Sequence, residues 1–127
     1  MNSLFFAQNA ELDDYPILES YVEGITSTDA DLGAIVIETY PTTNETFKNM
    51  SVRLSEDPDP VNNPDITFVY GFPSDWIVVS GAEGDFRVLD TSAYPLTPNT
   101  LYYFATSMTG TGESFVSLGI ESFTTLP

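Results

Sequence analysis

The amino-acid sequence predicts an all-β protein, an antiparallel β-sandwich of about seven strands. Prolines and glycines recur about every 8 to 12 residues, and the apolar runs between them are short, which is typical of all-β domains. Almost no segment fits the 3.6-residue period of an amphipathic helix. Residues 96 to 102 read L-x-P-x-T-x-Y, so a turn at Pro98 and Asn99 leads into a strand that Tyr102 opens. In β-sandwiches a tyrosine at this place folds under the turn between the sheets, and its hydroxyl bonds to backbone a few residues upstream.

The length of 127 residues suits one domain with its own core. We expect an N-terminal arm over residues 1 to 16 and a sandwich domain over residues 17 to 127. Hydrophobic residues make up 42% of the chain and aromatic residues 13%, a composition that excludes a wholly disordered chain.

Three strands are expected before the middle of the chain. The first lies near residues 17 to 25 (ILESYVEGI) and ends in a Thr- and Asp-rich turn over 26 to 32. The second covers residues 34 to 40 (AIVIETY), because Pro41 then stops the ladder. A weaker third strand covers residues 49 to 54 (NMSVRL).

The stretch SEDPDPVNNPD, residues 55 to 65, is expected to be a loop. Its prolines cannot donate to a β-ladder, and Asp and Asn satisfy turn backbone. A strong strand follows over residues 66 to 72. Its period of two places one set of apolar side chains on one face, and these are expected in the core: Ile66, Phe68, Tyr70 and Phe72.

The remaining strands alternate with glycine- or proline-bearing turns. Pro73 and Ser74 are expected to turn the chain before the next strand. The strands are expected at residues 76 to 79, 86 to 89, 101 to 108 and 115 to 124. Residues 109 to 112 (TGTG) connect the last two strands as a hairpin.

Several classes of chemistry are excluded by composition. The chain has no Cys and no His, so disulfides, thiolate nucleophiles and the best ligands of zinc, iron and copper are lacking. Nucleophiles activated by histidine are excluded for the same reason. A pair of carboxylates could still hydrolyse a glycoside, but no pair is singled out, so we expect no enzyme activity.

The charge is strongly negative, with 19 Asp and Glu against 3 Lys and Arg and a formal net charge of −16. Such a surface repels phosphate backbones and anionic membranes, so we expect neither nucleic acid nor lipid as a partner. Screening by salt relieves the self-repulsion. No stretch approaches the roughly 20 apolar residues of a membrane helix, and the first 16 residues do not resemble a secretory signal peptide.

Residues 94 to 125 resemble the fibronectin type III family. Leu96, Pro98, Thr100 and Tyr102 fall where that family carries L-x-P-x-T-x-Y. Gly112-Glu113-Ser114 resembles its G-x-S hairpin, and Phe123-Thr124-Thr125 resembles the F-x-T that closes the domain. The resemblance implies an immunoglobulin-like sandwich of seven strands in two sheets, used as an adhesive or structural module.

Two candidate sites lie outside the predicted core. Leu4, Phe5 and Phe6 form an apolar tip on the N-terminal arm, which either docks on a protein partner or packs on its own sandwich. The loop offers carboxylate and amide oxygens at spacings that calcium accepts: Asp57, Asp59, Asn62 and Asp65. The other interpretation is that these residues occupy turns for backbone reasons, with no cofactor bound.

Two aromatic residues have alternative interpretations. Tyr103 follows Tyr102 and must point to the opposite face of its strand. In one interpretation Tyr103 and Trp76 contact a sugar or a protein partner. In the other they are aromatic residues of the surface or the core without a binding role.

The sequence therefore predicts a non-catalytic structural or interaction module with a protein partner. The version we expect is a small component of a larger assembly, such as a phage capsid decoration protein or a tail or fibre-associated protein. It would be located in a virion or on a surface, where it could also form a homo-oligomer. The alternative is a carbohydrate-binding or adhesin module of a larger secreted protein, with calcium in the 55 to 65 loop.

Overall fold

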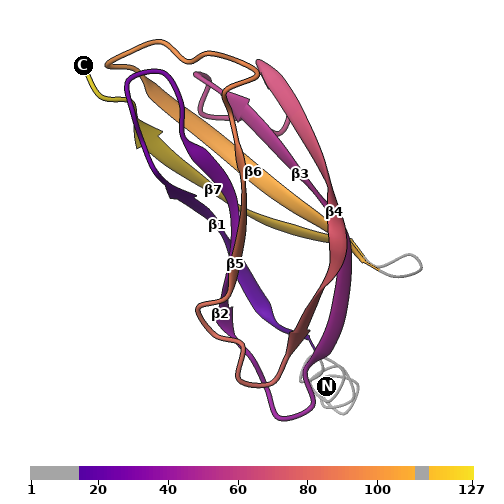
Figure 1. Ribbon diagram of the computed structural model, residues 1–127. Coiled ribbons are helices and arrows are strands. Elements are labelled where there is room, and N and C mark those ends of the chain that lie inside the picture. The colour runs from indigo at the N-terminus through magenta and orange to yellow at the C-terminus, as the bar shows by residue number, and fades with distance from the viewer. Residues whose placement is uncertain (1–14, 111–114) are drawn as a thin grey trace, which may run out of the picture.

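The computed structural model describes residues 15–110 and 115–127 and consists of seven antiparallel strands in two stacked sheets (Figure 1). One sheet has the order β1-β2-β5 and the other the order β4-β3-β6-β7. The strands are β1 (Ile17–Glu23), β2 (Asp31–Glu38), β3 (Asn44–Ser55), β4 (Ile66–Val79), β5 (Phe86–Asp90), β6 (Leu101–Gly110) and β7 (Phe115–Thr124). The prediction of an all-β antiparallel sandwich is confirmed.

The core lies between the two sheets and is built by alternation along each strand. In β3 the register shifts between Phe47 and Asn49. After this shift every second residue is fully buried: Met50, Val52 and Leu54. The expected inward set on β4 packs half-buried against this core: Ile66, Phe68, Tyr70 and Phe72. Trp76 is only 1% exposed and lies at 6.1 Å, ring centroid to ring centroid, from Phe47, so it is a core residue.

Tyr102 is buried under the turn that leads from β5 to β6. The backbone N–H of Thr97 donates to its Oη at 2.8 Å, and the Tyr102 ring stacks on Phe123 with centroids 5.7 Å apart. Asn99 has a φ of 54°, a left-handed conformation that asparagine tolerates better than most residues. The Thr125 Oγ1 donates to the Thr97 carbonyl at 2.6 Å, which ties the end of the chain to the same turn.

The structure differs from the sequence-based expectation at β4. The expected turn at Pro73 and Ser74 is wrong, because β4 continues through both residues. The pairing of β3 with β4 passes from Phe47 opposite Trp76 to Asn49 opposite Gly71, so residues 72–75 bulge out opposite Lys48. Proline is tolerated there because a bulged residue need not donate to the ladder.

The ends of three other strands also differ from expectation. β2 begins at Asp31 rather than at residue 34, and β3 begins at Asn44 rather than at residue 49. β6 extends to Gly110, two residues beyond the expected end. Most residues of these extensions are polar or glycine, and their backbone pairs with a neighbouring strand, which local apolar periodicity does not reveal.

A serine joins the two sheets where the β6–β7 ladder is irregular. The register shifts between Ala105 and Ser107, so Thr106 has no direct partner on β7. Ser20 of β1 fills this gap: its Oγ accepts from the Thr106 backbone N–H at 3.3 Å and donates to the Gly119 carbonyl at 2.5 Å. The serine hydroxyl thus replaces a missing ladder bond and links β1 to β7.

A second buried contact crosses between the sheets at Gly33 of β2. The Thr106 Oγ1 donates to the Gly33 carbonyl at 3.0 Å. On the other side of Gly33 the backbone of β5 passes very close, since a Cβ added there would meet the Arg87 carbonyl oxygen. Glycine is therefore required by the close approach of β2 and β5.

Candidate binding surface

The sequence-predicted site residues fall in three different places. Leu4, Phe5 and Phe6 lie outside the described residues. Leu96 and Tyr102 are buried, while Pro98 is exposed and Thr100 is half-buried, with its Oγ1 donating to the Pro98 carbonyl at 3.0 Å. These residues build the turn rather than a surface.

The acids of the loop between β3 and β4 bond to the loop itself. Asp57 accepts the Asp59 backbone N–H at 2.8 Å, and Asp59 accepts both the backbone N–H and the side-chain amide of Asn62. The bonds from Asn62 lower the pKa of Asp59. Asp65 is separate and accepts the Glu56 N–H at 3.0 Å. Within residues 15–110 and 115–127, no group of three or more acid side chains converges in a way that could hold a metal.

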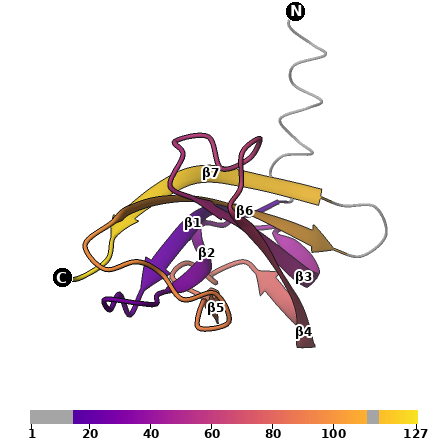
Figure 2. The same ribbon diagram turned by 90° about the horizontal axis from the view of Figure 1, so that it is seen from above.

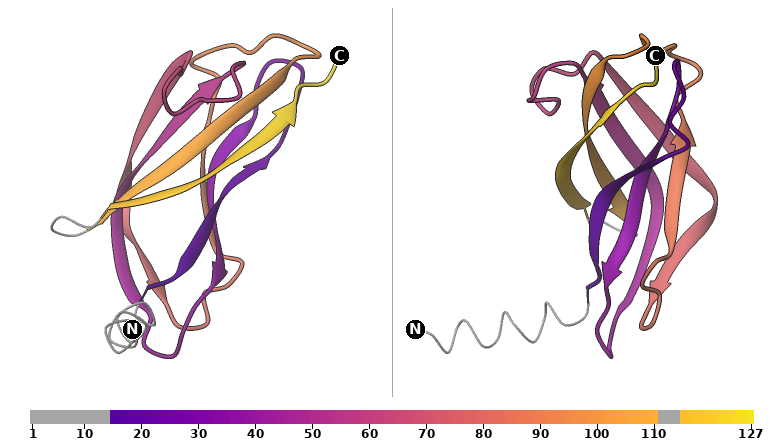
Figure 3. Two further views of the ribbon diagram at one scale, coloured as in Figure 1. Left: turned by 180° about the vertical axis from the view of Figure 1, so that it is seen from behind. Right: turned by 90° about the vertical axis from the view of Figure 1, so that its left-hand side faces the viewer.

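This loop rises from the outer side of the four-stranded sheet, away from β1, β2 and β5 (Figures 2 and 3). The Arg53 Nη1 donates to the Val61 carbonyl at 2.9 Å and fastens the loop to β3. Below Val61 lies an open groove of about 370 Å³ on the sheet. Its lining is mainly small and polar: Ser51, Arg53, Val61, Ala105, Thr106, Ser107, Thr109 and Ser117.

The outer side of the four-stranded sheet, here called the four-strand face, has few acids for so acidic a chain. Antiparallel partners share a face, so each row can be followed across the sheet. One row joins Val69, Ser51, Ser107 and Ser117, and another joins Thr67, Arg53, Ala105 and Ile120. The rows at the two ends contain Gly71, Asn49, Thr109, Tyr103 and Ser122.

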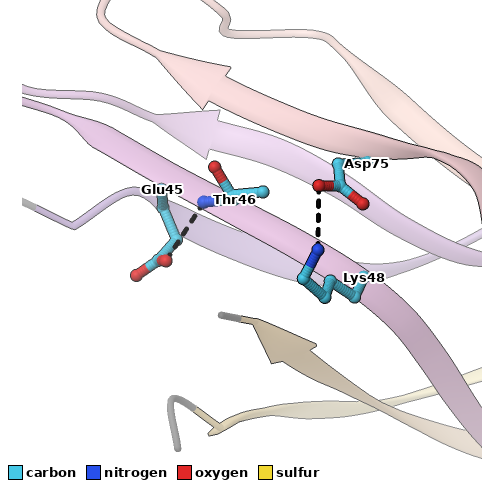
Figure 4. Close-up of polar contacts among 4 residues, drawn as sticks. All are labelled: Glu45, Thr46, Lys48 and Asp75. Atoms are coloured by element: carbon cyan, nitrogen blue, oxygen red, sulfur yellow. Dashed lines mark hydrogen bonds and ion pairs between the residues drawn. The ribbon is translucent and has the colours of Figure 1, made fainter. Parts of the chain in front are cut away.

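Each acid within the four strands is accounted for. Glu45 pairs with buried Val78, and Glu121 pairs with buried Phe104, so both project on the inner side, at the ends or edge of the sandwich. Asp75 lies in the bulge and is neutralised by Lys48, whose Nζ is 3.0 Å from its Oδ2 (Figure 4). The regular part of the four-strand face therefore carries no carboxylate.

Large apolar side chains are exposed on this same face. Val69, the fourth residue of β4, is 76% exposed. Others on the face or at its loop are more than a third exposed: Val61, Ile77, Val79, Leu101 and Ile120. Tyr103 is half-buried and points away from Tyr102, as alternation requires. A surface that combines exposed apolar groups with few charges is typical of an interaction site.

The opposite outer side, here called the three-strand face, is acidic. Glu23, Asp31 and Asp90 pair in one row across β1, β2 and β5. The Tyr21 Oη donates to Glu23 at 2.8 Å, and this bond raises the pKa of Tyr21. Partial burial, followed by repulsion from Asp90, Glu23 and Asp29, raises the pKa of Asp31.

Asp31→Asn should stabilise the fold at neutral pH by about 0.5 kcal/mol, because it removes like-charge repulsion within the row. A raised native pKa means that the folded state binds the proton more tightly than the unfolded state. The stability that this proton confers is present below the ordinary carboxyl pKa of 3.8 and is lost as pH rises through the native pKa. Urea unfolding of both proteins should therefore show a gain at pH 7 that vanishes below pH 3.8.

The control is Glu121→Gln, which removes one charge at an exposed position on β7. It should leave stability nearly unchanged at both pH values. If Glu121→Gln stabilised the fold as much as Asp31→Asn at pH 7, the effect would come from net charge and not from the row of Glu23, Asp31 and Asp90.

The sequence did not identify the four-strand face. Its signal was present in the alternate positions of β3 and β6, where Ser, Thr, Asn and Ala stand in a chain otherwise rich in Asp and Glu. Reading that signal needs the register of both strands.

Comparison with known proteins gives a distant structural likeness. No protein-family model matches the chain, and no curated protein matches it. Among solved structures, the sensor domain of the anti-sigma factor RsgI4 from Pseudobacteroides cellulosolvens is similar, with 17% sequence identity and a TM-score of 0.46. The match covers 87% of this chain and 94% of that one.

Proposed function

We propose that this chain is a non-catalytic interaction module that docks its four-strand face on a protein partner. The observation that carries the proposal is the distribution of carboxylates. Of a chain with 19 acids, the regular part of this face presents none, while it exposes Val69, Ile77 and Ile120. Burying an unpaired carboxylate costs several kcal/mol, so the strand rows of this face, beside the acidic 55 to 65 loop, are the part best suited to lose their water. The described strands of the three-strand face, by contrast, present four acids: Glu19, Glu23, Asp31 and Asp90.

We further propose that the module is immunoglobulin-like and similar to fibronectin type III domains. Two observations support this: the division of seven antiparallel strands into sheets of three and four, and the bond from the Thr97 N–H to Tyr102 at the start of β6. Sandwiches of this kind are used widely for binding.

The assembly that we propose is a virion-type particle, with this chain as a capsid decoration, tail or fibre-associated protein. With the four-strand face on the particle, the acidic three-strand face is turned to the medium. A dense negative surface is best tolerated in saline surroundings, because salt screens its repulsion. This version rests on analogy with modules of similar fold.

Val69→Glu should weaken assembly at least tenfold, because it places a charge on the most exposed apolar residue of the proposed interface. Val69 is 76% exposed, so the monomer should keep its fold. Binding is measured by adding purified protein to particles from the native source and quantifying the bound fraction. Cross-linking with mass spectrometry then identifies the contacted partner.

The matched control is Ile37→Glu, which adds the same charge at a 44% exposed position on the three-strand face. It should bind as the wild type does. Equal binding by both variants would refute docking through the four-strand face. Loss of binding with Ile37→Glu alone would show that the interface is on the three-strand face.

The alternative function is carbohydrate binding or adhesion, and the hydroxyl-lined groove under Val61 favours it. Its lining of Ser51, Arg53, Ser107 and Thr109 offers hydrogen bonds to a sugar. In this version the 55 to 65 loop would hold calcium. We expect a glycan array to show no binding, with or without calcium; a glycan whose binding Ser107→Val abolishes would establish the alternative.

A further inference from the structure

The three-strand face carries a row of carboxylates that the chain does not neutralise. Glu23, Asp31 and Asp90 lie at the same level on three adjacent strands. Neighbouring strands are about 4.8 Å apart, so the row places three like charges in close succession. Like charges directly opposite one another destabilise a sheet.

All three cations of the chain are engaged elsewhere. Lys48 pairs with Asp75 in the β4 bulge, and Arg53 bonds to the Val61 carbonyl on the four-strand side. The Arg87 guanidinium lies 4.9 Å from the centre of the Trp76 ring, at the open edge between the sheets. No Lys or Arg side chain is therefore left to compensate the row, and a partner could supply the counter-charge.

An apolar surface adjoins the carboxylate row. The next level along the strands carries Tyr21 and Val88 on either side of Gly33, and the level beyond it carries Ile35 and Phe86, with Glu19 on β1 at its other end. Because Gly33 has no side chain, the rings of Tyr21 and Phe86 meet across it with centroids 5.2 Å apart. Phe86 is 38% exposed, so this aromatic pair is accessible to a partner.

We propose that the three-strand face docks a protein segment that carries Lys or Arg beside apolar side chains. The cationic groups would lie over Glu23, Asp31 and Asp90, and the apolar groups would cover Tyr21, Val88 and Phe86. Charge complementarity selects this occupant, since a neutral or acidic segment would leave the row uncompensated. The site is on the opposite side of the sandwich from the four-strand face, so both can be occupied at once (Figure 2).

The test uses two synthetic peptides of equal charge, one alternating lysine with leucine and the other alternating lysine with serine. Each is titrated into the whole chain at physiological salt, with NMR amide shifts and calorimetry as readouts. The lysine–leucine peptide should shift amides of β1, β2 and β5 and should bind about tenfold more tightly than the lysine–serine peptide, because only it covers the aromatic pair. Equal affinities, or shifts spread over the whole surface, would show attraction to net charge alone and would overturn the proposal.

Two double variants separate the effect of the carboxylate row from the effect of the net charge of the chain. Asp31→Asn with Asp90→Asn should weaken the lysine–leucine peptide about tenfold. Glu56→Gln with Glu121→Gln removes the same charge at exposed positions elsewhere and should change the affinity less than twofold or so. Equal weakening by both pairs would overturn the proposal.

A third variant and a metal titration complete the test. Phe86→Ser should weaken the lysine–leucine peptide and leave the lysine–serine peptide unchanged. Thermal melting of each variant shows that it is folded, and the Asp31 and Asp90 variants should melt no lower than the wild type. If calcium or magnesium at micromolar concentration shifts the same amides and blocks the peptide, the row is a metal site and the docking proposal is wrong.

Discussion

Gly33→Ala should lower the free energy of unfolding by about 3 kcal/mol, because a methyl group at this position has no space. An added Cβ would lie 1.9 Å from the Arg87 carbonyl oxygen and 2.8 Å from the Val88 Cα. Both are backbone atoms of β5, so β2 and β5 must separate to accept the methyl group. That movement also strains the bond from Thr106 to the Gly33 carbonyl. Urea unfolding monitored by tryptophan fluorescence measures the loss.

Gly71→Ala is the matched control, because it makes the same substitution within a strand. A Cβ at Gly71 meets nothing within 4 Å. The substitution should be neutral or stabilising by a few tenths of a kcal/mol, since alanine reduces the freedom of the unfolded chain. If the two variants unfold at the same urea concentration, β5 does not pack against β2 as closely as described.

Ser20→Ala should cost about 2 kcal/mol, because it leaves two backbone groups without their shared partner. The buried Thr106 N–H loses its acceptor, and the Gly119 carbonyl loses its donor. Most of the cost comes from Thr106, which is only 1% exposed, because a buried donor left without its acceptor costs more than the bond itself contributes. The Thr106 amide should also exchange with solvent faster than in the wild type, which NMR can follow directly.

Ser122→Ala tests whether the effect belongs to the bridging position. Ser122 is an exposed serine on β7, and its replacement should change stability by less than about 0.5 kcal/mol. A similar stability of the Ser20 and Ser122 variants would mean that the hydroxyl bridge between β1 and β7 contributes little.

The second half of the fold could be predicted well from local sequence. The strand at residues 115 to 124 coincides with β7, and residues 101 to 108 lie within β6. Both strands are rich in apolar residues and lie next to strong turn signals. The placement of Tyr102 could be predicted because its motif specifies a local turn, and the Thr97 N–H that it binds is only five residues away.

β3 and β4 were predicted less well because their pairing is not local. Along β3 the buried residues run from Phe47 to Met50, a step of three rather than two. The bulge opposite Lys48 causes that step, so the alternation of β3 is out of phase on its two sides. Local sequence therefore indicated only the part of β3 from residue 49 onward. For β4, it predicted a turn at Pro73 where the strand continues.

Sequence analysis did not identify the two candidate surfaces for a related reason. Sequence analysis could raise the acids of the 55 to 65 loop as a candidate site, because their spacing is visible along the chain. The carboxylate row joins Glu23, Asp31 and Asp90, which are distant in sequence, and only strand register brings them together. The four-strand face is defined by the lack of Asp and Glu at alternate positions of its strands. No sequence motif corresponds to such a lack.

The bulge of β4 has a consequence for the behaviour of the protein at high concentration. β4 is an edge strand of 14 residues, and a long straight edge offers unpaired backbone groups to a strand of another molecule. Pro73 and the displaced residues around it divide that edge into two shorter pieces, so no long ladder can form along it. The interruption should make edge-to-edge pairing between copies less favourable, although valines and isoleucines are exposed on the chain.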